Sequence, residues 1–166
     1  MEPYNYSIKR VIDRLTKNIE RDNLVQETTM SLRKDLRVDR VVLYYFYSQW
    51  RGQVTFESLR DEKFSILGST GGDDCFNDEY AQLYLAGRVR AIADVQAEPI
   101  QPCHREFLES LQVQANLVVP ILTTKGLWGL LVAHHCQAIR PWLDTEIELM
   151  REGAKVLAEA PTIRDS

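Results

Sequence analysis

Residues 115–136, ANLVVPILTTKGLWGLLVAHHC, carry the clearest structural pattern in the chain. Residues 115–122 and 127–136 are rich in aliphatic and β-branched side chains, and TTKG between them has the composition of a turn. Two such runs joined by a short turn predict an antiparallel hairpin. Upstream, residues 39–48 (DRVVLYYFYS) and the alternating residues 53–59 predict a second hairpin.

The rest of the chain supplies helices and an irregular middle. Apolar residues at helical spacing predict one amphipathic helix over residues 8–33 and a closing helix over 142–159. The irregular middle, residues 61–112, contains three short predicted elements: helices at 75–86 and 102–111, and a strand at 89–95. We therefore expect one α+β domain over residues 1–166. In this arrangement the terminal helices cover one face of an antiparallel sheet, and a ligand pocket lies on the other face beneath residues 61–112.

Composition and charge exclude several classes. The 166 residues carry a net charge of −4, so there is no global electrostatic case for nucleic-acid binding. No apolar run approaches the roughly 20 residues that span a bilayer, and the first residues lack the apolar core of a signal peptide. These observations predict a cytoplasmic protein with no membrane segment. Phosphate-binding glycine loops, GxSxG and HExxH are absent from the sequence, and we do not expect an enzyme.

All the cysteines and histidines fall in three short segments that flank the predicted pocket. With one nearby carboxylate they form the following set: Asp73, Cys75, Cys103, His104, His134, His135 and Cys136. An odd number of cysteines argues against a disulfide framework. Simple core packing is one interpretation, and a metal site is weaker because no paired ligand spacing is present. A covalent ligand is the third, because Cys103 lies early in a predicted helix, where the helix dipole favours the nucleophilic thiolate.

Several blocks of the sequence resemble the chromophore-binding GAF domains of cyanobacteriochromes, in order and in spacing. The attachment segment of that family is similar to residues 102–108, PCHREFL. The other similar blocks are residues 86–95, 112–122, 127–136 and 140–142. In addition, residues 73–76 (DDCF) match the Asp-Xaa-Cys-Phe motif of the two-cysteine subfamily, and the 28 positions from Cys75 to Cys103 suit that subfamily.

The resemblance implies a linear tetrapyrrole, phycocyanobilin or its isomer phycoviolobilin, bound in the pocket. Cys103 resembles the residue that forms the permanent thioether, and Cys75 the one that adds reversibly. This second adduct would give a violet or blue to green photocycle driven by Z/E isomerisation. Asp73 resembles the carboxylate that accepts pyrrole N–H groups, and His104 resembles the neighbour that packs on the bilin.

Further positions follow from the same resemblance. Arg88 is a candidate clamp for a propionate, and His134 lies where the family usually has a histidine near ring D. His135 departs from the usual glutamine, and Cys136 receives no role. Five aromatic residues could line the pocket, although ordinary core packing explains each equally well: Phe76, Tyr80, Tyr84, Phe107 and Trp128.

The expected function is therefore a photoreceptor domain that signals to an output domain outside this chain, with no chemistry beyond autocatalytic chromophore attachment. A homodimer through the terminal helices is a further expectation. Two alternatives stay open: a non-photochemical GAF domain that binds a small ligand such as a cyclic nucleotide, and a cysteine redox or metal sensor. Expression in bilin-producing cells distinguishes the photoreceptor from these alternatives, because only the photoreceptor is expected to be coloured.

Overall fold

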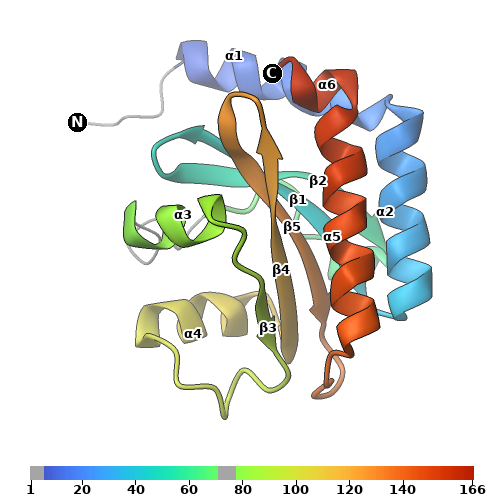
Figure 1. The fold of residues 1–166 in the computed structure, drawn as a ribbon, viewed down its shortest axis with the longest axis vertical. Helices are drawn as coiled ribbons and strands as arrows, with labels where there is room; N and C mark the ends of the chain where they lie inside the picture. Colours follow the sequence, from blue (N-terminus) through green and yellow to red (C-terminus); the bar gives the residue numbers. More distant parts are fainter. Residues whose placement is uncertain (1–5, 71–77) are drawn as a thin grey trace.

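A five-stranded antiparallel sheet forms the centre of the computed structural model, which describes residues 6–70 and 78–166 (Figure 1). The strand order is β2-β1-β5-β4-β3. The strands are β1 (Arg40–Ser48), β2 (Arg51–Leu59), β3 (Arg90–Ile92), β4 (Ala115–Thr123) and β5 (Gly126–His135). The helices are α1 (Tyr6–Glu20), α2 (Asn23–Leu36), the short 3-10 helix η1 (Glu62–Phe64), α3 (Asp78–Leu85), α4 (Pro102–Ser110), α5 (Asp144–Glu159) and α6 (Pro161–Arg164). The predicted α+β class and both hairpins are confirmed.

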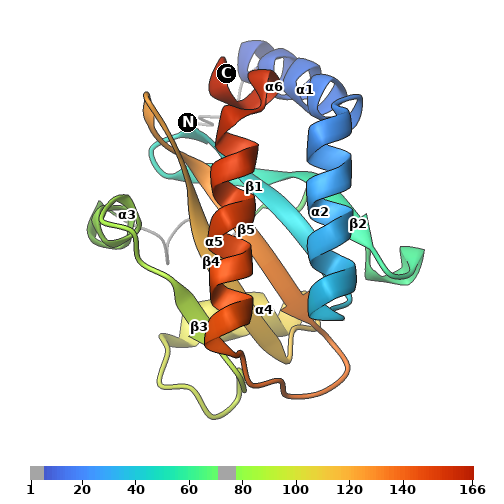
Figure 2. The same cartoon turned by 45° about the vertical axis from the view of Figure 1, so that its right-hand side comes forward.

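The two faces of the sheet are covered by different helices. Helices α2 and α5 lie side by side against one face, and α3 and α4 lie on the other (Figures 1 and 2). Because side chains alternate along a strand, odd-numbered residues of β1, β4 and β5 face α2 and α5. Val41, Leu117 and Leu131 belong to that main core, which α5 completes with Met150 and Leu157.

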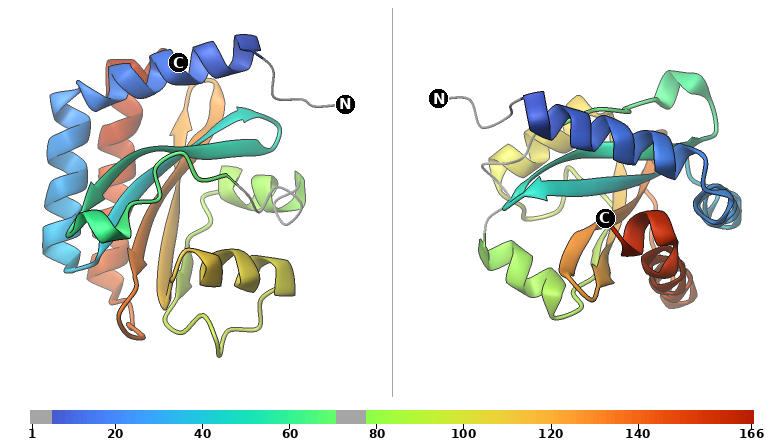
Figure 3. Two further views of the ribbon diagram at one scale, coloured as in Figure 1. Left: turned by 180° about the vertical axis from the view of Figure 1, so that it is seen from behind. Right: turned by 90° about the horizontal axis from the view of Figure 1, so that it is seen from above.

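The even-numbered residues of the same strands face α3. Val42, Val118, Leu130 and Val132 form a second apolar cluster with Tyr84 of α3. Helix α4 packs on a smaller third cluster near β3. Viewed from behind, α3 and α4 stand apart from the α2–α5 pair across the sheet (Figure 3). The pocket face is thus separated from the face that carries the main core.

The single N-terminal helix predicted over residues 8–33 is wrong, because the chain forms two helices there. The break lies at Asp22, whose carboxylate accepts hydrogen bonds from the backbone N–H groups of Leu24 (2.9 Å) and Val25 (3.2 Å). This side chain caps α2 and satisfies donors that have no partner inside the helix. Its other oxygen accepts a hydrogen bond from Thr162 at 2.8 Å, which ties the break to α6. The break redirects the chain, so that α1 crosses the end of the α2–α5 layer (Figure 3).

Candidate functional site

A cavity of about 370 Å³ lies between the even-numbered face of the sheet and helices α3 and α4. Its floor is apolar and includes Val42, Val118 and Val132. Leu83 and Tyr84 of α3 form one wall, and α4 forms another. The volume lies within the range of about 300–1,000 Å³ that is usual for small-molecule sites. The pocket predicted beneath the irregular middle is therefore present in the structure.

Helix α4 carries the predicted attachment residue at its first turn. Pro102 occupies the first helical position, where its missing N–H costs nothing, and Cys103 follows with an exposed side chain. Arg105 fixes this helix by donating hydrogen bonds to the carbonyls of Val95 (3.3 Å) and Glu98 (2.5 Å). Gln101 and His104, which flank Pro102 and Cys103 in the sequence, line the cavity. The thiol position is thus held at the edge of the cavity by a docked helix.

The cysteines differ in their chemical state. Cys103 is disulfide-bonded, contrary to the expectation of no disulfides, whereas Cys136 is a free, half-buried thiol. Burial raises the pKa of the Cys136 thiol, which makes it a poor nucleophile at neutral pH. Attachment of a ligand through Cys103 requires the reduced thiol.

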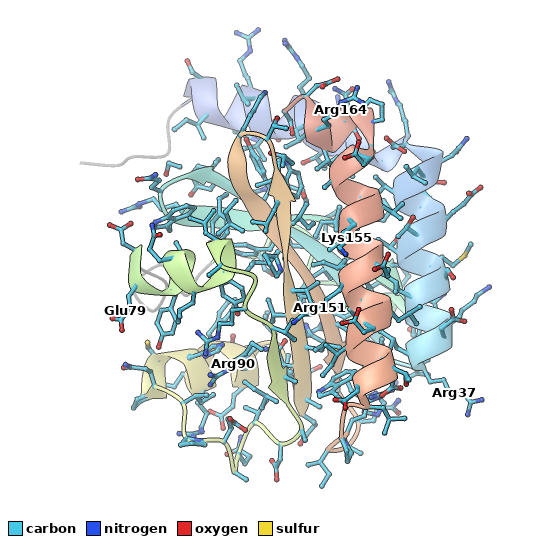
Figure 4. All side chains as sticks on the ribbon, in the orientation of Figure 1. Arg37, Glu79, Arg90, Arg151, Lys155 and Arg164 are labelled. Atoms are coloured by element: carbon cyan, nitrogen blue, oxygen red, sulfur yellow. The ribbon has the colours of Figure 1, made fainter. Side chains whose placement is uncertain are left out.

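Two arginines give the cavity a positive side, and a histidine lies beside them. Arg88 and Arg90 both line it, and Arg90 lies between α3 and α4 (Figure 4). The Arg88 guanidinium lies 5.7 Å from the ring centroid of Tyr84 and 5.8 Å from that of Tyr80. Burial, aided by the charges of Arg90 and Arg88, lowers the pKa of His104 to about 4. At neutral pH His104 is uncharged, and the two arginines remain to attract carboxylates.

Arg90 is a residue that the sequence reasoning missed. Its Nε–H is buried and has no hydrogen-bond partner among the described residues. An unpaired buried donor in a cavity wall is costly unless a ligand or water supplies an acceptor. Arg90 lies two residues after the predicted Arg88 clamp, and this spacing could have indicated it.

His134 lines the deep end of the cavity, as predicted, and has a partner that was not predicted. The buried Arg40 donates from Nε to Nδ1 of His134 at 3.0 Å. Burial, followed by the charge of Arg40, lowers the pKa of His134 well below its ordinary value. Asn116, opposite His134 on β4, also lines the cavity, and its Oδ1 is buried without a partner among the described residues.

Asp39 forms a buried polar junction beside this end of the cavity. Its carboxylate accepts hydrogen bonds from the Cys136 backbone N–H (2.6 Å), Gln137 Nε2 (3.0 Å) and Arg60 Nε (2.8 Å). Nδ1 of His135 lies 3.8 Å from the same carboxylate. The junction therefore ties the start of β1 to the segment that follows β2 and to the end of β5. His135 and Cys136 belong to it, and neither lines the cavity.

The predicted aromatic lining is right in part. Tyr80, Tyr84 and Phe107 line the cavity. Trp128 does not: it lies in the main core, 5.0 Å from the ring centroid of Tyr45. The cause is a register shift between β4 and β5, in which Ile121 opposes Gly129 while Leu122 opposes Leu127. Trp128 is the extra residue of this bulge, which moves it to the opposite face of the sheet.

Three predicted site residues, Asp73, Cys75 and Phe76, lie outside the described residues. Within residues 6–70 and 78–166, no group of three or more His, Cys, Asp and Glu side chains could hold a metal ion. The described part of the chain also contains no helix with the length and apolar character of a membrane span.

Comparison with known proteins agrees with this geometry. The sequence model of the GAF domain matches residues 20–160. An uncharacterised protein of Picosynechococcus sp. (strain PCC 7002) is 51% identical over 155 residues, which cover 93% of this chain and 95% of that protein. The circadian input-output histidine kinase CikA of Synechocystis sp. (strain PCC 6803) is 31% identical over 92% of this chain, but the match spans only 24% of its own length.

Solved structures resemble the whole domain. A crystal structure of the cyanobacteriochrome receptor PixJ has a TM-score of 0.72 and 32% identity, covering 80% of this chain and 93% of that one. The phycocyanobilin-bound GAF domain of a cyanobacterial phytochrome has a TM-score of 0.74 and 30% identity, covering 96% of both chains.

Proposed function

Because the chain belongs to the GAF domain family, we propose that it is a bilin-binding photosensor domain with its ligand in the cavity under α3 and α4. The observation that carries this proposal is the combination of an apolar cavity, a cysteine at its edge and two arginines along one side. A bilin is a flat, largely apolar chain of four pyrrole-type rings with two propionates. The apolar floor, Arg88 and Arg90 fit that chemistry, as does the buried Oδ1 of Asn116, which has no hydrogen-bond partner in the described part of the chain.

We assign the protein residues the following tasks. Cys103 anchors the ligand: its sulfur bonds to a carbon of a ligand double bond and its proton goes to the conjugated system, so no leaving group or oxidant is needed. Arg88 and Arg90 hold the propionates, and His104 packs against the ligand as an uncharged imidazole. The bilin, when bound, supplies light absorption and Z/E isomerisation. Attachment is the only chemical step, so the domain is not an enzyme acting on a separate substrate.

The finer proposal concerns subfamily and signalling. We propose phycocyanobilin or phycoviolobilin as the ligand, and reversible addition of Cys75 as the cause of a violet or blue to green photocycle. Support comes from the Asp73–Phe76 motif and its spacing to Cys103. Signalling would reach an output domain outside this chain, since relatives such as CikA are much longer than this domain. Dimerisation through the terminal helices belongs to the same proposal.

Co-expression with bilin synthesis tests the main proposal. The purified chain, kept reduced, should be coloured and should change its absorbance under alternating illumination. Cys103→Ala should lose the denaturant-resistant adduct, measured as zinc-induced fluorescence of the denatured band. Cys136→Ala is the matched control, because this thiol lies outside the cavity and should leave the band intact. A colourless wild-type protein would refute bilin binding, and an undiminished band in Cys103→Ala would refute the anchor.

The second cysteine has its own test. Cys75→Ser should abolish the violet or blue band and leave a longer-wavelength species that is still anchored through Cys103, because a hydroxyl is a far poorer nucleophile than a thiol at neutral pH. If both absorption bands stay where they are, the two-cysteine assignment is wrong while bilin binding stands.

The observation that favours a second candidate is the disulfide bond of Cys103, which would also suit a redox-responsive domain. That function predicts a colourless protein whose thermal stability changes between oxidised and reduced forms. The absorbance measurement above therefore separates the two candidates.

A further inference from the structure

Helix α1 carries positive charge on the side that faces away from the domain. Residues 6–21 contain five basic and two acidic residues, a net charge of +3, whereas the whole chain has a net charge of −4. The helix lies across one end of the molecule, and α2 and α5 run away from it (Figure 1). We infer that this end is a docking surface for an anionic membrane, on which the domain lies without crossing the bilayer. The inference goes beyond the proposed function and does not depend on bilin binding.

The apolar side of α1 is used by the domain itself. Ile12, Leu15 and Ile19 are buried, and Leu15 and Ile19 belong to the main core. Their spacing of i, i+3 and i+7 places them on one side of a helix. Packing of this side on the core therefore determines which side of α1 faces outward.

The basic residues of α1 lie on the outward side. Arg10, Arg14 and Lys17 are all exposed. At about 100° per residue they fall within an arc of about 60°, roughly opposite the buried residues, and extend about 10 Å along the helix axis. Arg21, which is also exposed, follows directly after the helix ends. Arg10, Arg14, Lys17 and Arg21 are called the basic stripe below.

Most of the basic stripe is not neutralised inside the domain. The ion pairs within residues 6–70 and 78–166 do not include Arg14, Lys17 or Arg21. Asp13 and Glu20, the acidic residues of α1, lie to one side of the stripe by the same angular count. Arg14 and Lys17 are three residues apart, so their like charges repel each other on the helix surface. An anionic surface would remove this repulsion and attract each cation.

A planar anionic surface fits the position of the stripe. Helices α2 and α5, with 14 and 16 residues, extend about 20 Å away from α1. Charges are screened beyond a Debye length of about 8 Å at physiological ionic strength. A membrane that contacts α1 is therefore screened from the acidic residues at the far end of the domain. Clusters of about four to eight basic residues on an amphipathic helix are typical of binding to anionic lipids.

An exposed apolar side chain beside the stripe favours a membrane over other anionic partners. Val11 lies between the stripe and the buried side of α1 and is 59% exposed. Apolar side chains of a helix that lies on a membrane enter the boundary between headgroups and acyl chains. Nucleic acids and acidic peptides supply negative charge but no such apolar layer. A second copy of this chain on the same face would set the cations of two stripes against each other.

Cosedimentation with lipid vesicles tests the inference on the reduced, ligand-free protein. Vesicles of phosphatidylglycerol and phosphatidylcholine in equal parts should bind it, and vesicles of phosphatidylcholine alone should not. Each basic residue near an anionic surface is worth about fivefold in binding, so the double variant Arg14→Gln/Lys17→Gln should bind about 25-fold more weakly. Burial of Val11 should favour the vesicles about fivefold over polyglutamate or duplex DNA at the same concentration of negative charge, and Val11→Ser should remove this preference.

Two further double variants serve as controls. Lys34→Gln/Arg37→Gln removes the same charge at the far end of α2, where Arg37 lies at the opposite end of the molecule from α1 (Figure 4), and should bind like wild type. Arg14→Lys/Lys17→Arg keeps the charge and should also bind like wild type. All these side chains are exposed, so thermal unfolding should be unchanged. The inference is overturned if anionic vesicles do not bind, if both glutamine variants lose binding equally, or if polyglutamate or DNA binds as tightly as the vesicles.

Discussion

Replacing Asp39 with asparagine should destabilise the domain more than any ordinary surface substitution. The carboxylate is fully buried and accepts hydrogen bonds from three residues: Cys136 (backbone), Gln137 and Arg60. Asparagine keeps the shape but removes the charge and turns an N–H₂ group toward one of these donors. The three contacts join the start of β1 to the end of β5 and to the chain after β2. Loss of these hydrogen bonds should therefore weaken the packing of the strands that form the pocket.

The magnitude follows from the burial of the partners. Breaking a buried ion pair from one side costs about 3–5 kcal/mol. Arg60 is 44% exposed, so solvent screens its share, and we expect the lower end, about 3 kcal/mol. For a domain of this size that is about 6–12 °C in Tm.

The effect should depend on pH. Burial opposes ionisation of Asp39, but the hydrogen bonds from Cys136 and Arg60 and the nearby positive groups outweigh it and lower its pKa. A carboxyl whose folded pKa lies below its unfolded value stabilises the fold fully above the unfolded value, about pH 3.9, and loses this contribution as the pH falls through the folded pKa. The difference between wild type and Asp39→Asn should therefore be constant near neutrality and shrink in acid.

Urea and thermal unfolding followed by circular dichroism, at pH 7 and again below pH 4, measure this difference. Asp13→Asn is the matched control: its carboxylate pairs with Lys9 at 3.1 Å, but both side chains are 56% exposed. That exposed pair should contribute at most about 0.5 kcal/mol. An Asp39→Asn protein as stable as the control at pH 7, or a difference that does not change with pH, would refute the reasoning.

Three further predictions separate the two faces of the sheet. Trp128→Phe should lose the hydrogen bond to Ser166 Oγ (2.6 Å) and about 1 kcal/mol of unfolding free energy, while the absorption spectrum of bilin-loaded protein stays unchanged. Gly129→Ala should cost about 3 kcal/mol in urea unfolding, because a Cβ there would lie 2.1 Å from the Tyr44 carbonyl oxygen, a backbone atom that cannot move aside. Arg88→Gln should weaken phycocyanobilin binding about tenfold in a titration of the apoprotein, with little change in Tm.

Local patterns were sufficient to predict much of this architecture. Runs of β-branched, aliphatic and aromatic residues, together with the alternation of residues 53–59, indicated the strands, and Pro102 correctly marked the start of α4. The predicted position of His134 came from the family resemblance. The structure places His134 in the cavity lining, on the even-numbered face of β5 that it shares with Leu130 and Val132. Arg88, Tyr84 and His104 also line the cavity as expected. Their tasks toward a bilin remain proposals.

The errors have identifiable physical causes. Asp22 interrupts an amphipathic stripe that looks continuous, and the signal was present, since Asp is a common N-cap residue. The bulge that moves Trp128 depends on pairing between β4 and β5, which no pattern within one strand reveals. Arg40 and Asn116 were missed for a similar reason: each lies near the start of its strand, and only the pairing of three strands brings them together with His134.

The separation of these two faces explains how one small domain can combine stability with ligand selectivity. The face toward α2 and α5 is almost entirely apolar and buries residues such as Leu131 and Met150 completely, so it stabilises the fold without needing a ligand. The opposite face retains buried polar atoms, at Arg90 and Asn116, that have no hydrogen-bond partner within residues 6–70 and 78–166. Such atoms weaken the empty protein and become useful only when a ligand pairs them. Substitutions on the first face should therefore alter unfolding free energy at constant spectrum, and those of the polar residues on the second face should alter ligand properties at nearly constant stability.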